Sequence, residues 1–370
     1  MKAVGYIKPL HIDHPEALLD IEVDIPVPTG RDLLVRVKAA AVNPIDCQVR
    51  ASEAGPNGQA RILGWDAAGI VEAVGPRCSF FAPGDAVFYA GDRFRPGCNA
   101  EFQLVDERIV GRKPRHLGCT AAATLPLASI TAWEALFDRL EVAPSGASSG
   151  KSLLVIGAAG GVGSVAIQLA RKVAQLRVIA TASRSLSRDW CLRSGAHEVI
   201  DHFGDMPRQL RELDLDGVDY ILCLKDTDRH FDAMAAMIRP YGCICATEET
   251  RRDHDLSLLL GKSASFVWES TFTRSLYRGP NMVEQHHILN AVAALVDSGT
   301  LHTTVTEVVG TLNAANLRKA HAELESGRVV GKLVLEGYER AVAQTQEIAP
   351  AQVLRSHGNP WHDPYRVRLA

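Results

Sequence analysis

The chain has 370 residues, of which 46% are hydrophobic and 22% are charged, and its formal net charge is −3. This is the composition of a globular protein with enough residues for two domains. The slight negative charge argues against nucleic-acid binding, and the lack of an apolar run of about 18 residues argues against a membrane span. The eight cysteines form no paired framework, and the first residues are strand-like rather than a signal peptide. We therefore expect reduced thiols and a cytoplasmic protein.

The N-terminal third of the chain has the pattern of a small β-rich domain. Short apolar runs are separated by glycines and prolines, and the run at 33–39 alternates as a half-buried strand does. Short strands joined by such turns are typical of a compact barrel. Strands are predicted at 21–25, 33–39, 69–75, 83–88 and 100–105.

From about residue 120 the pattern changes to alternating helices and strands. Two helical stretches, at 121–126 and 129–137, lead into it. Strands that alternate with helices predict a doubly wound parallel sheet. Strands are predicted at 217–223, 243–247, 264–268, 305–309 and 332–335, and helices at 231–238, 286–298 and 314–326. The elements after residue 300 are expected to return the chain to the first domain.

The clearest functional signal is the stretch 152–164, with the sequence SLLVIGAAGGVGS. Strand-like residues are followed by three glycines at three-residue spacing and then by residues 165–172, whose apolar positions suit one helix face. Such glycines let a diphosphate approach the free amide groups at the start of the helix. A purely structural glycine turn is the alternative, because G-x-x-G-x-x-G is not the commoner spacing. The predicted dinucleotide-binding residues are Gly157, Ala159, Gly160, Gly161, Val162 and Gly163.

The end of the next strand predicts which dinucleotide binds. Residues 176–181 have the pattern of this strand, and no acid follows them to bind the adenosine ribose of NAD. Ser183, Arg184 and Arg188 follow instead, and a hydroxyl with two guanidinium groups suits the 2′-phosphate of NADPH. The sequence therefore favours NADPH over NADH, with ordinary solvated surface residues as the alternative interpretation.

Five sequence blocks in the same order resemble the medium-chain dehydrogenase/reductase superfamily, and most of all its zinc-free quinone oxidoreductase branch. The joint pattern is far more specific than any one block. The blocks are AVNPID at 41–46, LGWDAAG at 63–69, PGDAV at 83–87, the glycine turn at 157–163 and GKLVL at 331–335.

The resemblance covers about residues 1–336 and implies an α/β architecture. A GroES-like β-barrel catalytic domain is expected at 1–125 and 300–337, and a Rossmann domain with a doubly wound parallel sheet at 126–299. The resemblance also implies a cofactor between the two domains and a homodimer. The tail at 338–370 stands outside the resemblance, and its small polar residues predict a flexible or loosely docked segment.

Roles for individual residues also follow from the resemblance. Asn43 is expected to face the nicotinamide and the substrate, and Thr131 to lie near the carboxamide. Asp46 and Trp65 are expected to help form the substrate slot.

Three more residues have roles implied by their positions in the family pattern. Tyr89 donates a hydrogen bond or a proton to a developing enolate, with a packing aromatic residue as the alternative. Lys332 approaches the cofactor from the last strand, with a surface lysine as the alternative. His202 stands where a tyrosine often follows the third Rossmann strand, so that a ring is kept and its hydroxyl is lost.

The resemblance argues against a metal site. Zinc-dependent relatives have Cys, His and Cys where this chain has Asn43, Trp65 and Leu127. A tetrahedral catalytic zinc needs three such side-chain ligands and an open position. Cys98 stands alone where a structural-zinc lobe would need four closely spaced thiolates.

Without a Lewis acid, the expected chemistry is hydride transfer from NADPH to an acceptor that is already electrophilic. The acceptors expected are a quinone or an α,β-unsaturated carbonyl, which need orientation more than acid–base help. One alternative is an enone or enal reductase in which quinone turnover is incidental. Another is a sensor that binds NADPH with little turnover.

Overall fold

The computed structural model describes residues 1–144 and 146–338. The predicted tail at 338–370 therefore lies outside the described residues apart from Tyr338. Within the described residues, no helix is long and apolar enough to cross a membrane.

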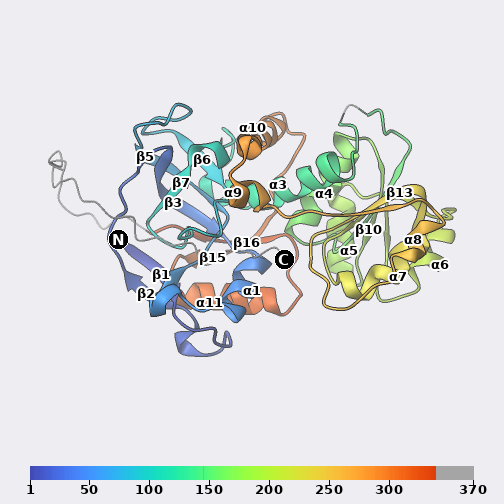
Figure 1. Ribbon diagram of the computed structural model, residues 1–370, viewed down its shortest axis with the longest axis horizontal. Coiled ribbons are helices and arrows are strands. Elements are labelled where there is room, and N and C mark those ends of the chain that lie inside the picture. Colours follow the sequence, from blue (N-terminus) through green and yellow to red (C-terminus); the bar gives the residue numbers. More distant parts are fainter. Residues whose placement is uncertain (145, 339–370) are drawn as a thin grey trace, which may run out of the picture. The chain divides into compact units, whose positions relative to one another are not determined.

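The β-rich part of the chain contains two sheets among its described residues (Figure 1). A small antiparallel sheet has the order β2-β1-β4, from β2 (Leu19–Glu22), β1 (Lys2–Tyr6) and β4 (Arg61–Ile62). A larger sheet has the order β15-β16-β3-β5-β6-β8, with β7 paired to β3. Its strands are β3 (Asp32–Ala41), β5 (Ala67–Val74), β6 (Ala86–Tyr89), β7 (Phe102–Asp106), β8 (Val110–Arg112), β15 (Val305–Thr311) and β16 (Lys332–Glu336). Strands from both ends of the sequence thus share one sheet.

A parallel sheet with the order β11-β10-β9-β12-β13-β14 follows in the middle of the chain. Its strands are β9 (Ser152–Ile156), β10 (Arg177–Thr181), β11 (Glu198–Ile200), β12 (Val218–Cys223), β13 (Ile238–Ala246) and β14 (Ser265–Trp268). The order runs outward in both directions from β9 and β12, as in a doubly wound sheet. The predicted GroES-like barrel with a Rossmann sheet is confirmed as the fold class.

The helices connect and cover these strands (Figure 1). They are α1 (Pro44–Ser52), α2 (Cys119–Ala122), α3 (Pro126–Trp133), α4 (Gly161–Lys172), α5 (Ser185–Ser194), α6 (Met206–Arg211), α7 (Thr227–Met237), α8 (Ser257–Leu260), α9 (Thr273–Tyr277), α10 (Glu284–Asp297) and α11 (Ala314–Glu325). Four short 3₁₀ turns among the described residues are η1 (Pro15–Ala17), η2 (Pro56–Gly58), η3 (Glu107–Ile109) and η5 (Pro280–Val283), and the π-helical segment η4 (Glu134–Arg139) continues α3.

The parallel sheet is apolar on both faces because successive residues of a strand point to opposite sides. On β9, Leu153 and Val155 belong to the buried cluster that includes α3 and α4, whereas Leu154 and Ile156 belong to the cluster that includes α6 and α7. The sheet is therefore covered on both sides, which explains why its strands have continuous apolar runs rather than alternating ones.

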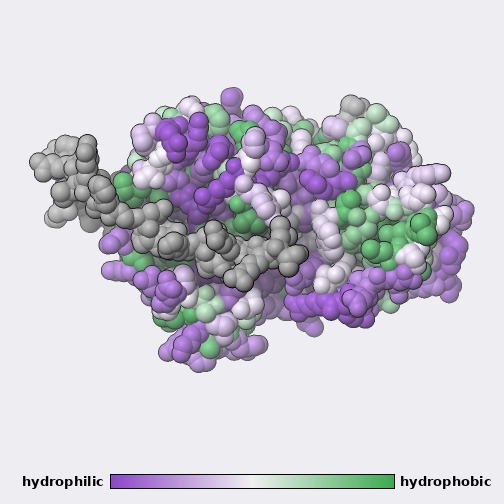
Figure 2. Space-filling view, in the orientation of Figure 1, coloured by the Kyte–Doolittle hydropathy of each residue, from purple (hydrophilic) through white to green (hydrophobic). Residues whose placement is uncertain are grey.

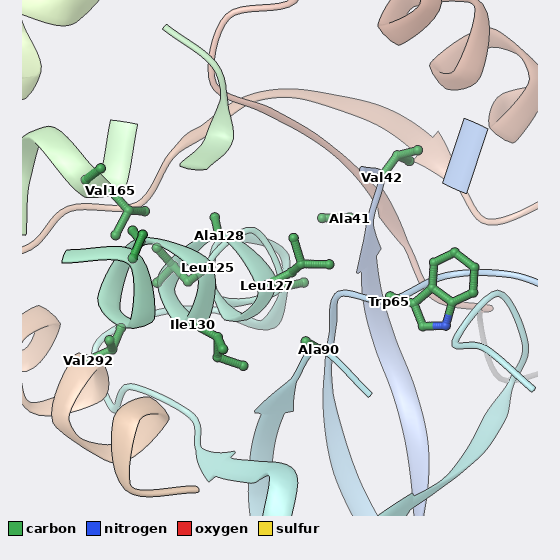
Figure 3. Close-up of a cluster of buried hydrophobic side chains, with 14 of the residues drawn as sticks. Ala41, Val42, Trp65, Ala90, Leu125, Leu127, Ala128, Ile130, Val165 and Val292 are labelled. Carbon is green, nitrogen blue, oxygen red and sulfur yellow. The ribbon is translucent and has the colours of Figure 1, made fainter. Parts of the chain in front are cut away.

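One buried cluster contains side chains from both the barrel part and the Rossmann part of the chain. Figure 3 shows Leu127 and Ile130 on α3 between Val165 and Val292 on one side and Trp65 on the other. Helix α3 is buried along nearly its whole length, from Pro126 to Ala132, because these residues are apolar or have small polar side chains. It therefore packs against both parts of the chain.

Helix α1 (Pro44–Ser52) was not predicted from the sequence. It begins directly after Asn43, with Pro44 at its first position and a capping box in which the Asp46 carboxylate accepts from the Asn43 backbone N–H. Proline at the first turn and Asx residues at the cap are strong start signals. They were missed because the helix is short and only four of its residues are buried.

Candidate active site

The glycine turn between β9 and α4 has the geometry of an anion-binding site. Gly157 has φ +79, a conformation that side chains rarely adopt. A Cβ on Gly163 would lie 2.4 Å from the carbonyl oxygen of Ala158, so only glycine allows α4 to begin this close to the end of β9. The first N–H groups of a helix have no partner within the helix, and its dipole is positive there. The residues of the turn therefore fit a diphosphate.

The last strand lies directly against this turn. Gly160 and Gly331 form an isolated parallel bridge, and the Gly331 N–H donates to the carbonyl of Ala159 at 2.8 Å. A Cβ on Gly161 would lie 2.6 Å from Cδ of Lys332. The aliphatic part of the Lys332 side chain thus lies on the glycine turn, which brings β16 of the barrel sheet to the start of α4.

The Lys332 ammonium forms a buried polar cluster with Asn43 and Asp66. It donates to Oδ2 of Asp66 at 2.7 Å and to Oδ1 of Asn43, whose amide donates to the same Asp66 oxygen at 3.3 Å. The side chains of Lys332 and Asp66 are 4% and 0% exposed. Burial raises the pKa of Asp66, and the Lys332 ammonium opposes that rise. An ion pair this far from water depends on both partners, because either charge alone would be strongly unfavourable.

Two helices begin at this cluster. Asp66 accepts at its other oxygen from the N–H of Leu127 at 3.0 Å, in the first turn of α3. Asp46 accepts from the N–H of Asn43 at 2.6 Å, at the start of α1. Burial raises the pKa of Asp46 to about 7, although the Asn43 N–H and the Lys332 charge both lower it. The second oxygen of this carboxyl group has no hydrogen-bond partner among the described residues.

Trp65 and Thr131 lie near the cluster but have partners of their own. The Trp65 ring is 1% exposed and meets Phe272 edge to face, with 6.0 Å between the ring centroids. The Thr131 hydroxyl donates to the carbonyl of Leu127 at 2.7 Å and also forms a hydrogen bond with the Thr271 hydroxyl. Thr271 and Phe272 follow the end of β14 at Trp268 by three and four residues, so this segment links the parallel sheet to α3 and to Trp65.

Tyr89 lies in a different buried cluster from Trp65. It is 0% exposed and packs inside the barrel, in the cluster that contains Val87 and Cys98. Burial raises its pKa well above the ordinary value, so the phenol is neutral. Its hydroxyl has no hydrogen-bond partner within 1–144 and 146–338. The structure therefore does not bring Tyr89 together with Asn43 through any hydrogen bond.

The residues predicted for the adenosine end lie at the carboxyl ends of β10 and β11. Ser183 is half-buried, whereas Arg184 and Arg188 are exposed at the start of α5. One nitrogen of Arg184 donates to the carbonyl of Arg328 at 2.9 Å. His202 is half-buried, and burial lowers its pKa, so its ring is neutral at pH 7.

The residues at the expected zinc-ligand positions do not fit a catalytic zinc ion. They are an amide, an indole and an aliphatic side chain, and the facing oxygens of Asn43 and Asp66 bind the Lys332 ammonium. Tetrahedral zinc needs three nitrogen, sulfur or carboxylate ligands around an open position. No group of three or more His, Cys, Asp and Glu side chains that could hold a metal occurs in the described part of the chain.

Asp66 is the central residue of the site that the sequence reasoning did not single out. It stood within the block at 63–69, next to Trp65, and an acid between apolar residues and glycines was the signal that could have identified it. Thr271 was missed as well, and no local pattern marks it.

A GroES-like barrel, a parallel sheet and a glycine turn at the start of α4 define a class of two-domain oxidoreductases that bind nicotinamide dinucleotides. Residues 29–125 match the alcohol dehydrogenase GroES-like domain, and residues 194–335 match the zinc-binding dehydrogenase family. A zinc-type alcohol dehydrogenase-like protein of Staphylococcus aureus is 40% identical over 336 residues, which cover 90% of this chain and 99% of that protein. The chain belongs to the medium-chain dehydrogenase/reductase superfamily.

Solved structures and more distant relatives agree with this family. A putative zinc-dependent alcohol dehydrogenase of Rhizobium etli has 48% identity and a TM-score of 0.87, covering 92% of this chain and 99% of that one. Escherichia coli quinone oxidoreductase complexed with NADPH has the same fold at 22% identity and a TM-score of 0.76, covering 91% and 100%. A quinone oxidoreductase of Lama guanicoe is 35% identical over 194 residues, 52% of this chain and 56% of that protein. The 2-methylene-furan-3-one reductase of Solanum lycopersicum is 35% identical over 223 residues, which cover 56% of this chain and 54% of that protein.

Proposed function

We propose that the protein is an NADPH-dependent, zinc-independent reductase that transfers hydride to a quinone or another activated carbonyl or alkene. The observation that carries this proposal is the buried Lys332 ammonium between Asn43 and Asp66, where a metal-dependent enzyme would need ligands. The partial matches to a quinone oxidoreductase and a 2-methylene-furan-3-one reductase support this class of acceptor.

The bound nicotinamide cofactor supplies the hydride. The amide groups of Gly160 to Gly163 bind its diphosphate, and Ser183, Arg184 and Arg188 bind the 2′-phosphate. Thr131 binds the carboxamide group of the nicotinamide. His202, which follows β11, places its neutral ring beside the adenosine of the cofactor.

The polar cluster at the start of α1 and α3 orients the acceptor. A quinone or enone is already electrophilic, so hydrogen bonds to its oxygen are enough to stabilise the charge that develops there. The Asn43 amide and the Lys332 ammonium are the donors available for this role, and Asp66 keeps the ammonium in place. Asp46 and Trp65 shape the slot. Tyr89 donates a hydrogen bond or a proton to the developing enolate, with packing inside the barrel as the alternative role of its ring.

We also propose that the protein is a homodimer joined at the edge of the parallel sheet. Strand β14 is the last in the sheet order, and Trp268 on it is 47% exposed. Three leucines at or beside α8, Leu256, Leu258 and Leu260, are 62%, 46% and 78% exposed. Figure 2 shows hydrophobic residues gathered at the surface around α8 and β13. An exposed strand edge beside an apolar patch is a common pairing surface.

The dimer proposal is tested by sedimentation of Trp268→Glu beside Phe94→Glu. Phe94 is a matched control because it is 48% exposed on the barrel part of the chain. The first variant is expected to be monomeric and the second to behave as the unaltered protein. Equal sedimentation of all three proteins would contradict a dimer through β14.

The reaction is tested by NADPH oxidation with metal-stripped protein and four acceptors. These are an ortho-quinone, a para-quinone, a short enal and a cyclic enone, with NADH measured in parallel. Turnover without zinc and a preference for NADPH are expected. A faster reaction with the enal or enone would identify an enone or enal reductase, and a requirement for zinc would refute the proposal. NADPH binding without oxidation of any acceptor would identify a sensor.

A further inference from the structure

A polar cavity lies away from the glycine turn, between the barrel strands and the segment that follows α9. Its volume is about 420 Å³, within the range of small-molecule sites. Backbone from Thr29 to Asp32 and the η3 turn form its barrel side, and Arg278 and Met282 form the other side. Its lining includes five arginines: Arg31, Arg77, Arg95, Arg108 and Arg278.

Three of these arginines are held by carboxylates. Arg95 donates to Asp32 at 2.7 Å, and Arg108 donates to both oxygens of Asp106 at 2.9 and 2.8 Å. Arg31 donates to the buried carboxylate of Glu107 at 2.5 Å. These pairs fix the wall of the cavity, because paired guanidinium groups have little freedom to turn away.

The other two arginines have donors left for a ligand. Arg77 is exposed and forms no ion pair with any described residue, and its guanidinium lies over Gly30, where a Cβ would be 2.9 Å from Nη2. The Arg278 side chain is 64% exposed, and its nitrogen is 3.8 Å from Asp92, too far for a hydrogen bond. Five arginine side chains stand against four carboxylates, those of Asp32, Asp92, Asp106 and Glu107. The wall of the cavity therefore carries more positive than negative charge.

Arg278 is positioned by the helix before it. It ends α9 with φ +49, a left-handed conformation that is unusual for arginine. Within α9, Arg274 donates to Glu134 at 2.8 Å and to Asp138 at 2.7 Å. These bonds hold α9 against η4, and Arg278 lines the cavity from the C-terminal end of this helix.

We propose that this cavity binds a small oxyanion with two or more negative charges, held between Arg77 and Arg278. Planar guanidinium groups bind phosphate and carboxylate oxygens in pairs, so a phosphate compound and a polycarboxylate share the required chemistry. The site does not depend on the proposed reaction, since none of its lining residues belongs to the glycine turn or to the Asn43 cluster.

The proposal is tested by calorimetric titration of the full-length protein with pyrophosphate and, separately, with citrate. Titrations are made at low salt with saturating NADPH, so that the cofactor's own phosphate site is filled. One equivalent of pyrophosphate or citrate is expected to bind, and the stronger of the two identifies the class of anion. Arg77→Gln and Arg278→Gln are each expected to weaken binding about tenfold or more, as expected for loss of a charged hydrogen bond.

Arg115→Gln is the matched control, because Arg115 is exposed on the same barrel part of the chain and does not line the cavity. This variant is expected to bind both anions as the unaltered protein does. All three variants are expected to keep the same NADPH affinity and thermal midpoint. No binding to the unaltered protein, or equal weakening in all three variants, would overturn the proposal.

Discussion

The two polar ends of the proposed cofactor site differ in their exposure to water. At the Asn43 cluster, Lys332 is 4% exposed and Asp66 is fully buried, and each partner's charge is matched by the other. At the proposed 2′-phosphate end, Arg184 and Arg188 are exposed and form no ion pair with a described residue. Charges in the first region are fixed by the fold, whereas those in the second are screened by water and counterions.

This difference shows how substitutions in the two regions should act. A buried charge pair contributes to folding and to the site at once, so a change there affects both. An exposed arginine contributes to ligand affinity with little effect on folding. The largest effects on folding are therefore expected at the buried end and the smallest at the exposed end.

The largest effect is expected from separating the buried pair. Asp66→Asn keeps the size of the side chain but leaves the Lys332 ammonium without a counter-charge. The free energy of unfolding is expected to fall by about 3–5 kcal/mol, as for other broken buried pairs. Lys332→Met should be similarly destabilising, and the double variant should recover much of the loss. Urea unfolding of the three variants measures this coupling.

A surface pair is the control for that experiment. Lys319 and Glu307 form an ion pair at 3.1 Å with both side chains about half exposed, at 54% and 42%. Lys319→Met is expected to leave the unfolding midpoint unchanged. Additive effects of the two changes at Asp66 and Lys332 would show that their charges do not depend on each other.

A smaller loss of folding stability is expected from a substitution in the glycine turn between β9 and α4. Gly163→Ala would place a Cβ 2.4 Å from the Ala158 carbonyl oxygen, which belongs to the backbone and has little room to move. We expect a loss of about 1–3 kcal/mol and weaker cofactor binding. Gly118→Ala is the control, since a Cβ there meets nothing within 4 Å. Thermal unfolding with and without NADPH measures both effects, and equal midpoints for the two variants would contradict this prediction.

The pH dependence of stability tests the environment of Asp46. Burial raises its pKa from 3.8 to about 7, so the folded protein holds a proton that the unfolded chain has lost between these values. This contribution to stability is complete below pH 3.8, falls as pH rises, and is lost above about pH 7. Asp46→Asn is expected to flatten this part of the curve. The same slope in both proteins, from urea midpoints between pH 5 and 8, would assign it to another group.

The smallest effect on folding is expected at the exposed end. Arg184→Gln and Arg188→Gln are expected to raise the Kd for NADPH about tenfold while the Kd for NADH and the thermal midpoint stay the same. Arg193→Gln, on the same helix, is the control and should change neither constant. Fluorescence titration with both cofactors measures this. Equal loss of NADH and NADPH binding would show that these arginines do not recognise the 2′-phosphate.

The sequence alone determined the fold class and the local shape of the glycine turn. The spacing of Gly157, Gly160 and Gly163 after a strand is a local property, and the structure confirms the strand, the turn and the helix at that place. The absence of an acid after β10 is also local, although the preference for NADPH stays a prediction. Alternating strands and helices identified the parallel sheet because each element carries its own periodicity.

Only the tertiary structure decided what surrounds the polar end of the site. Asp66 and Lys332 are 266 residues apart in sequence, and Asn43 and Lys332 are 289 apart. Their contact arises because β16 pairs with β3 in the barrel sheet while Gly331 lies against the glycine turn. Sequence periodicity describes which face of an element is buried, but it carries no information about which distant charge is buried opposite. For that reason Asp66, the carboxylate that makes the burial of Lys332 stable, was missed, although the family resemblance predicted Lys332 near the cofactor.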